Sequence, residues 1–285
     1  MKFSSAIFCL TACFHANANE WRDGPNGHKL IVINALDTQV GAKGFAKNPL
    51  RNIHLATYLI ADTETTVEQF AAFVKATNYV TDAERLKMGR VAKEGMADWA
   101  WISVEGAYWR FPHGPAQAAA ENNHPVTQIS GADSRAYAVW IGGRLPTIDE
   151  WEIAASAGAT TRYPWGEEFD PKKANIWNGE SHRKNTREDG FLFTCPVRSF
   201  PPNNWGLYEV IGNVFEYCEG IPNELTMKKT TRDQVIAGRG GSWWCSATTC
   251  SYFNLRDVGT MSVHGSIANQ GFRIAFDEKS VPAKK

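Results

Sequence analysis

Two cysteines five positions apart, Cys245 and Cys250, are the residues of this sequence best suited to redox or metal chemistry. They end the segment GRGGSWWCSATTC, residues 238–250, behind a glycine pair and two tryptophans. Two thiolates are soft donors, which select soft metal ions over hard cations. A structural disulfide is an equally open interpretation of this spacing. Zinc is not favoured, because a structural zinc site takes four ligands and no nearby histidines or cysteines complete one.

The first 18 residues predict an export signal. Lys2 supplies a positive charge, residues 6–14 form a short apolar run, and residues 16–18 (ANA) fit the small-x-small cleavage rule. The protein is therefore expected to be periplasmic or secreted. The segment LTAC, which ends at Cys13, also resembles a bacterial lipoprotein box, so a lipid anchor on this cysteine is a second interpretation.

Removal of this leader leaves four cysteines in the predicted mature chain, residues 19–285. Disulfides persist in exported proteins, but four cysteines allow three full pairings and the sequence alone does not choose among them. Cys195 and Cys218 flank the segment 206–217. We expect a structural disulfide between them, with two free buried thiols as the alternative.

Length and charge place the chain among ordinary globular proteins. It has 285 residues, zero formal net charge, 21% charged residues and 43% hydrophobic residues, a balance typical of soluble domains. Zero net charge gives no electrostatic signature of nucleic-acid binding. No apolar run reaches the roughly 18 residues of a membrane-spanning helix. We expect one domain and a monomer.

Regular elements are predicted mainly in the first half of the chain. Residues 53–60 alternate and are rich in β-branched side chains, which predicts a strand. A helix is expected after Thr66, with apolar residues at helical spacing. Residues 131–140 predict a second helix. Thr147, with Glu150 three positions later, forms a capping box that predicts a third.

The remainder reads as irregular chain. Residues 86–123 predict a loop with short strands, and its tryptophans argue against disorder. After Gly158 about a hundred residues are rich in glycine, proline, asparagine and tryptophan, with only short strand-like runs. This composition indicates a fold held by side-chain packing and by bound ions.

Eight phrases, in order, resemble the formylglycine-generating enzymes, also called sulfatase-modifying factors. The resemblance covers roughly residues 53–276 and implies a single α+β domain with little regular secondary structure, distantly similar to C-type lectins. The phrases are HPVTQIS, GGRLPTIDEWEIAASAG, YPWGEEF, ANIWNGE, NTREDGF, PVRSFPPNNWGLYEVIGNVFEYC, GRGGSWWC and NQGFRIAF.

This resemblance implies an oxidase. Cys245 and Cys250 fall on the pair that binds copper(I) as thiolates in the family, where the substrate cysteine adds a third sulfur and O2 oxidises it to an aldehyde. Low coordination leaves room for that sulfur, and metal binding deprotonates the incoming thiol. Ser242 matches a family serine near the site and could relay a proton or position the substrate sulfur.

The resemblance also implies two calcium sites, built from side chains and main-chain carbonyls as calcium prefers. The implied ligands of the first are the Asn175 side chain, the Ile176 carbonyl, the Asp189 carboxylate and the Phe191 carbonyl. Those of the second are Glu209, the carbonyls of Gly212 and Val214, and Glu216.

The substrate side departs from the family pattern. Between Cys250 and Arg273 only Arg256 remains, and Val258 stands where an arginine is expected. The expected partner is an unfolded sulfatase-type peptide. Because this surface is altered, a second hypothesis is that the protein resembles a periplasmic branch of the family. That branch acts in pyoverdine maturation, where it is linked to chromophore oxidation, and its substrate would be a peptide siderophore precursor. A non-enzymatic lectin-like binding module with a bridged cysteine pair is the third hypothesis.

Overall fold

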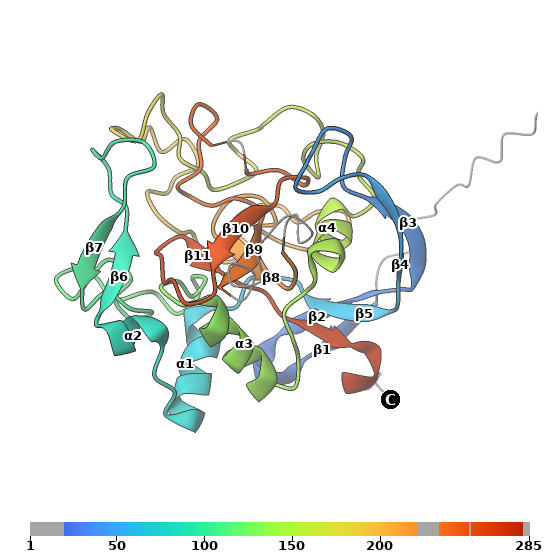
Figure 1. The fold of residues 1–285 in the computed structure, drawn as a ribbon, viewed down its shortest axis with the longest axis horizontal. Coiled ribbons are helices and arrows are strands. Elements are labelled where there is room, and N and C mark those ends of the chain that lie inside the picture. Colours follow the sequence, from blue (N-terminus) through green and yellow to red (C-terminus); the bar gives the residue numbers. More distant parts are fainter. Residues whose placement is uncertain (1–19, 222–233, 251, 282–285) are drawn as a thin grey trace, which may run out of the picture.

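Two four-stranded sheets form the centre of the molecule, and a β-hairpin lies toward each end (Figure 1). The computed structural model describes residues 20–221, 234–250 and 252–281. The predicted export signal and Cys13 lie outside these residues. Within the described residues, no helix has the length and apolar character needed to cross a membrane.

The first sheet is antiparallel throughout. Its strands lie in the order β1 (Trp21–Asp23), β2 (Lys29–Ile33), β5 (Tyr58–Ala61) and β12 (Ala275–Asp277). The sheet thereby joins the two ends of the described chain. Both faces of β2 and β5 are covered. Leu30 and Val32 pack into one apolar core and Ile31 and Ile33 into another, which explains why β2 is apolar at successive positions.

The second sheet carries the segments that lead to the cysteine pair. Its order is β10 (Gly259–Ser262), β9 (Val235–Arg239), β8 (Phe215–Cys218) and β11 (Gln270–Gly271), with β8 and β11 parallel. The two hairpins are β3 (Leu36–Val40) with β4 (Arg51–Leu55), and β6 (Met88–Val91) with β7 (Ile102–Glu105). Short 3-10 turns span Pro25–Gly27 and Glu278–Ser280.

The three predicted helices are confirmed as α1 (Val67–Thr77), α3 (Gly131–Trp140) and α4 (Ile148–Ser156), and a short helix that was not predicted, α2 (Asp82–Leu86), lies between the first two. All four begin with a reciprocal capping box. At α4 the Thr147 hydroxyl accepts from the Glu150 amide while the Glu150 carboxylate accepts from the Thr147 amide, as expected. Helices α1 and α3 pack on one face of the first sheet, whereas α4 packs into the core on its other face.

The prediction of a single strand over residues 53–60 is wrong. The segment divides between β4, which pairs with β3, and β5, which pairs with β2 and β12. Residues 56 and 57 are the break, where the chain leaves the hairpin and enters the central sheet. The β-branched residues of this segment belong to two different sheets, and the alternation of apolar and polar residues does not show where β4 ends and β5 begins.

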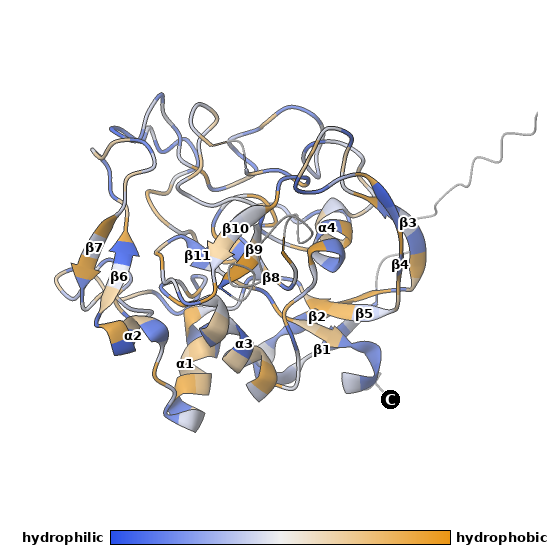
Figure 2. Cartoon of the chain, viewed as in Figure 1, coloured by the Kyte–Doolittle hydropathy of each residue, from blue (hydrophilic) through white to orange (hydrophobic). Residues whose placement is uncertain are grey.

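Residues 157–214 contain no helix or strand, as their composition predicts. Figure 2 shows apolar residues gathered in β5, β9 and α1, while much of the irregular chain is hydrophilic or mixed. Asn213 ties this region together. Its side chain donates to Glu64 (2.9 Å) and accepts from the Cys195 amide (2.9 Å), and its amide donates to the Asn175 carbonyl (2.8 Å).

A buried ion pair connects both sheets with α4. The Glu216 carboxylate on β8 accepts from the Arg273 guanidinium and from the Trp151 indole (2.7 Å). Arg273 also donates to the carbonyls of Ala61, on β5, and Tyr208. Both charged side chains are excluded from water. Such a pair is costly to bury, and removing one partner is costlier, because the other charge is left unpaired.

Arg273→Met is therefore expected to lower the free energy of unfolding by about 3–5 kcal/mol, since Glu216 would remain buried without a counter-charge. Arg135→Met is the matched control, because its bidentate pair with Glu219 is partly exposed and should contribute at most about 1 kcal/mol. Urea unfolding of both variants measures the difference. Equal losses would contradict the assigned role of the buried pair.

Candidate functional site

The two sulfurs of Cys245 and Cys250 lie 2.9 Å apart in the loop after β9. This separation exceeds the roughly 2.05 Å of a disulfide, and both residues are free, buried thiols. A turn creates the approach, because the Cys250 amide donates to the Ser246 carbonyl (2.9 Å). Gly241 precedes the pair with a φ of 77°, and a Cβ there would lie 2.5 Å from Phe253. Only glycine allows this close approach.

The two thiols hold one hydrogen bond between their sulfurs. Burial and the neighbouring Cys250 raise the pKa of Cys245 well above its usual range. The hydrogen bond from Cys245 lowers the pKa of Cys250. Both shifts follow from one arrangement, in which the Cys245 thiol donates the hydrogen bond and the Cys250 sulfur accepts it. A soft metal ion would replace the proton of this hydrogen bond, because thiolates are its ligands.

Ser242 lies beside the pair, as expected from the sequence. Its hydroxyl is 4.0 Å from the Cys245 sulfur and accepts a hydrogen bond from the Asn269 side chain (2.8 Å). Asn269 was missed by the sequence analysis, although it belongs to the quoted phrase NQGFRIAF. Its side-chain oxygen is buried and has no hydrogen-bond partner in the described part of the chain.

A groove of about 330 Å³ opens beside Cys245. Aromatic side chains dominate its wall, and Lys47 is the one charged residue among the described residues that line it. Such a wall favours apolar or planar groups. The lining residues are Lys47, Trp99, Trp101, Phe215, Trp244, Cys245, Tyr252, Gly259, Thr260, Met261, Ile267, Asn269 and Gln270.

The altered arginine positions do not contribute a free cation to this groove. Arg256 donates to the Glu152 carboxylate (2.7 Å), which is buried and also accepts from Arg239 (2.9 Å). Val258 is fully buried in the core. Neither position therefore supplies a free positive charge to the substrate side of the site.

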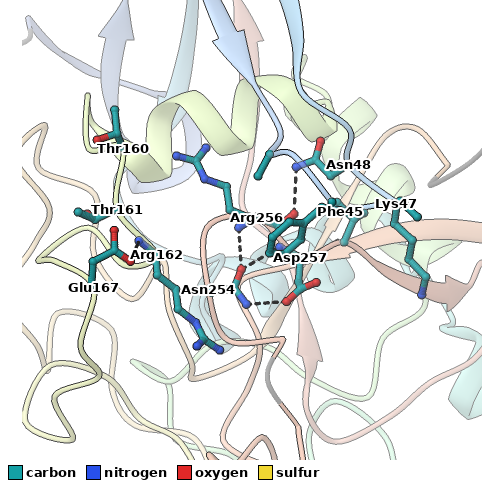
Figure 3. Close-up of a pocket in the computed structure, with 14 residues that line it drawn as sticks. Phe45, Lys47, Asn48, Thr160, Thr161, Arg162, Glu167, Asn254, Arg256 and Asp257 are labelled. Carbon is teal, nitrogen blue, oxygen red and sulfur yellow. Dashed lines mark hydrogen bonds between the residues drawn. The ribbon is translucent and has the colours of Figure 1, made fainter.

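A second pocket of about 650 Å³ lies next to the groove, and Lys47 lines both. Figure 3 shows Asn254, Arg256 and Asp257 in its centre, joined by hydrogen bonds. Thr160 and Arg162 lie on the opposite side from Lys47. A chain bound in the groove could continue into this polar pocket.

The residues expected at the first calcium site are brought together. The Asp189 carboxylate accepts from the Ile176 amide and the Phe191 amide, each at 3.0 Å. The Asn175 side chain donates to the Phe193 carbonyl (2.8 Å). Burial raises the pKa of Asp189 to about 6. Asp189 is a half-buried carboxylate whose two oxygens accept from main-chain amides, and a calcium ion at this position would take such oxygens as ligands.

The second set fits calcium poorly, because Glu216 is already neutralised by Arg273. Glu209 accepts from the amides of Arg198 and Phe200, and burial raises its pKa to about 7. Glu64, which the sequence analysis did not single out, shares this environment. Its pKa is raised well above its usual range by burial and by Glu209 and Glu216.

The expected disulfide between Cys195 and Cys218 is contradicted, since both are free, buried thiols. Cys195 lies in irregular chain, where its amide donates to Asn213 (2.9 Å). Cys218 ends β8 inside the apolar core, with its sulfur directed at the Glu216 carbonyl (3.7 Å). The two cysteines flank one segment of the sequence, but the fold places their sulfurs in different environments.

No group of three or more histidine, cysteine, aspartate or glutamate side chains in the described ranges is arranged to hold a metal ion. Among the described residues, a metal ion at this site would therefore be bound by the sulfurs of Cys245 and Cys250, without a histidine or a carboxylate as a third ligand. Two-sulfur ligation suits copper(I) and leaves room for a further sulfur.

Comparisons with known proteins identify relatives along most of the chain. Residues 17–278 match the family described as sulfatase-modifying factor enzyme 1-like domain. A formylglycine-generating enzyme of Thermomonospora curvata is 38% identical over 262 residues, 81% of this chain and 86% of that protein. The Mus musculus enzyme of the same name is 35% identical over 268 residues, 85% of this chain and 71% of that protein.

The relatives also include a protein named as inactive and a solved structure with the same fold. A Bos taurus protein named inactive C-alpha-formylglycine-generating enzyme 2 is 34% identical over 285 residues, 90% of this chain and 92% of that protein. The solved structure of PvdO from Pseudomonas aeruginosa has a TM-score of 0.66 at 20% identity, and the match covers 92% of this chain and 99% of that one. This likeness concerns the fold, and it confirms the expected single α+β domain.

Copper(I) titration against a competing chelator is expected to reveal one tight site per reduced chain. Cys250→Ala should weaken it by more than about 100-fold, because losing a ligand costs more than losing an outer partner. Cys195→Ala is the matched control, since it removes an equally buried thiol outside the pair and should leave binding unchanged. Equal binding by the two variants would refute the assignment.

Calcium is expected to stabilise the protein more at pH 7.5 than at pH 5. The folded-state pKa of Asp189 is raised to about 6, so its contribution to stability is present below its unfolded pKa of about 4 and is lost as pH rises through 6. Calcium would offset that loss and raise Tm by about 5 °C at a hundredfold excess over Kd. Asp189→Asn should abolish this response. A calcium response independent of pH and of Asp189 would contradict the site.

Proposed function

Because the chain belongs to the sulfatase-modifying factor family, whose relatives include formylglycine-generating enzymes, we propose that it oxidises a peptide cysteine to formylglycine with copper(I) and O2. The observation that carries the proposal is the pair of reduced sulfurs 2.9 Å apart beside an aromatic groove. Relatives named as inactive also match the chain. The proposal therefore rests on the cysteine pair and not on family membership alone.

The overall reaction balances with an external reductant. The substrate thiol carbon loses two electrons, its C–S bond breaks and a C=O bond forms. Dioxygen accepts four electrons, and a small thiol such as glutathione supplies the other two. The products are the aldehyde, hydrogen sulfide, water and the disulfide of the reductant. Copper(I), when held by Cys245 and Cys250, would supply dioxygen activation and a binding position for the substrate sulfur.

The remaining residues of the site orient the substrate and exclude water. Ser242, fixed by the hydrogen bond from Asn269, lies where it can exchange a proton with a sulfur near Cys245. Asn269 also lines the groove, so it holds Ser242 next to the position of a bound substrate. Trp244 and Tyr252 provide apolar faces for the side chains on either side of the reacting cysteine.

The charge and shape of the groove also limit which substrates it can bind. The residues that line it include no carboxylate, so a basic side chain of the peptide would bind through aromatic faces and not through an ion pair. A planar siderophore precursor fits the same wall, which keeps siderophore maturation as the second candidate function. We also propose that the predicted leader exports the protein, which would place its substrate outside the cytoplasm.

A reduced peptide containing C-x-P-x-R is expected to gain an aldehyde when incubated with copper-loaded protein, oxygen and a thiol reductant. Hydrazide capture and mass spectrometry detect the product. The Cys250→Ala variant and a peptide with serine in place of cysteine should both give background signal. Cys195→Ala should match the unaltered protein, because its thiol lies outside the pair.

The other outcomes separate the hypotheses. An inert peptide together with oxidation of a dihydro-siderophore precursor would contradict the proposal and support the second function. No reaction with either substrate, combined with a permanent Cys245–Cys250 bridge in the purified protein, would leave a binding module.

A further inference from the structure

His182 is a fully buried histidine whose two ring nitrogens each face a hydrogen-bond acceptor. Nδ1 lies 2.9 Å from the Asp98 carboxylate, and Nε2 lies 2.7 Å from the main-chain carbonyl of Trp244. Neither acceptor can supply a proton. A ring with a proton on both nitrogens would make both hydrogen bonds, and Asp98 would balance its positive charge.

The histidine ring is also stacked on the tryptophan that precedes Cys245. The ring centroids of His182 and Trp244 are 3.9 Å apart with an interplanar angle of 28°. Trp177 packs on both, at 5.3 Å and 4.8 Å. A positively charged ring over an indole face gains a cation–π interaction. His182 thus holds Trp244 by its carbonyl and by its side chain together.

Asp98 anchors the other end of this contact. Its carboxylate accepts from both the amide and the ring of His182, and these hydrogen bonds lower the pKa of Asp98. The next residue, Trp99, has a φ of 63° and is 53% exposed, and both it and Trp101 line the groove. A left-handed conformation is unfavourable for a tryptophan and persists when surrounding contacts hold it.

Further contacts join the same two segments. The Gly95 amide donates to the His182 carbonyl (3.1 Å), and the Asn185 amide donates to the Glu94 carboxylate (2.8 Å). The segment 94–101 is therefore attached to the segment 182–185 at several points. Of these attachments, the Asp98–His182 pair alone continues to the residue that precedes Cys245.

We propose that His182, held as an imidazolium by Asp98, is a positioning residue that fixes the tryptophan wall of the groove relative to the cysteine pair. This inference rests on the proposed function, because it assigns the wall formed by Trp99 and Trp101 to binding of the thiol substrate. The pair sets where the substrate lies and takes no part in metal binding.

The protonation state is tested in the intact protein without any substrate. Nitrogen-15 NMR of histidine-labelled protein at pH 7.5 should show both ring nitrogens of His182 protonated, and Asp98→Asn should abolish this signature. His54 is the matched control, since Nδ1 of its exposed ring pairs with Asp37 at the same 2.9 Å distance. Asp37→Asn should leave the His182 signals unchanged. A neutral His182 ring in the unaltered protein would overturn the proposal.

The positioning role is tested by His182→Phe, which keeps an aromatic stack but loses both hydrogen bonds, and by Asp98→Asn. Both should raise KM for the thiol peptide about tenfold, as expected for lost hydrogen bonds to charged groups, with kcat and copper(I) affinity within about twofold. Hydrogen exchange of the amides of residues 97–101 should accelerate in both variants. His54→Phe should change none of these quantities.

The outcomes distinguish failure of the inference from failure of the proposed function. Unchanged exchange in residues 97–101, or a fall in kcat and copper(I) affinity at constant KM, would overturn the positioning role. If the unaltered protein oxidises no thiol, the proposed function fails, while the NMR and exchange measurements still decide whether the Asp98–His182 pair holds the wall.

Discussion

The buried contact of Glu216 with Arg273 and Trp151 is the interaction on which the remaining structure depends. Its partners come from β8, from the segment before β12 and from α4, and Arg273 extends it to β5. The strands are short, so their ladders alone would hold the two sheets weakly. A charged pair without access to water adopts one geometry that satisfies its hydrogen bonds, which fixes how the sheets and α4 meet.

Buried polar side chains also connect the irregular chain to its neighbours. Asn213 connects Glu64, Cys195 and Asn175, and Glu152 connects Arg239 with Arg256. These buried polar groups satisfy backbone atoms that no helix or strand could satisfy. The cysteine loop leaves β9 at Arg239, which pairs with Glu152, and its two sulfurs lie 2.9 Å apart. A preorganised ligand pair avoids the cost of ordering when a metal ion or substrate binds.

The sequence was most informative where local chemistry decides the structure. Thr66 and Thr147 predicted helix starts correctly, because a capping box is complete within four residues. The irregular character of residues 157–214 followed from composition. The break between β4 and β5 was missed, since alternation alone does not reveal that neighbouring strands join different sheets.

Site prediction failed where partners lie far apart in the sequence. Cys195 and Cys218 flank one segment, yet the fold places them in separate environments. Asn269 and His182 were not singled out, because their roles depend on contacts with residues 27 and 62 positions away. By contrast, Cys245 and Cys250 come together through a single turn, which made their proximity predictable from spacing.

The central claim is that Cys245 and Cys250 form an open two-sulfur site that accepts a substrate sulfur. X-ray absorption at the copper edge of the copper(I)-loaded protein, with and without a thiol peptide, tests it most directly. We expect sulfur-only ligation that gains one sulfur when the peptide binds. Nitrogen or oxygen ligands in place of the two cysteine sulfurs, or a spectrum that the peptide leaves unchanged, would contradict it.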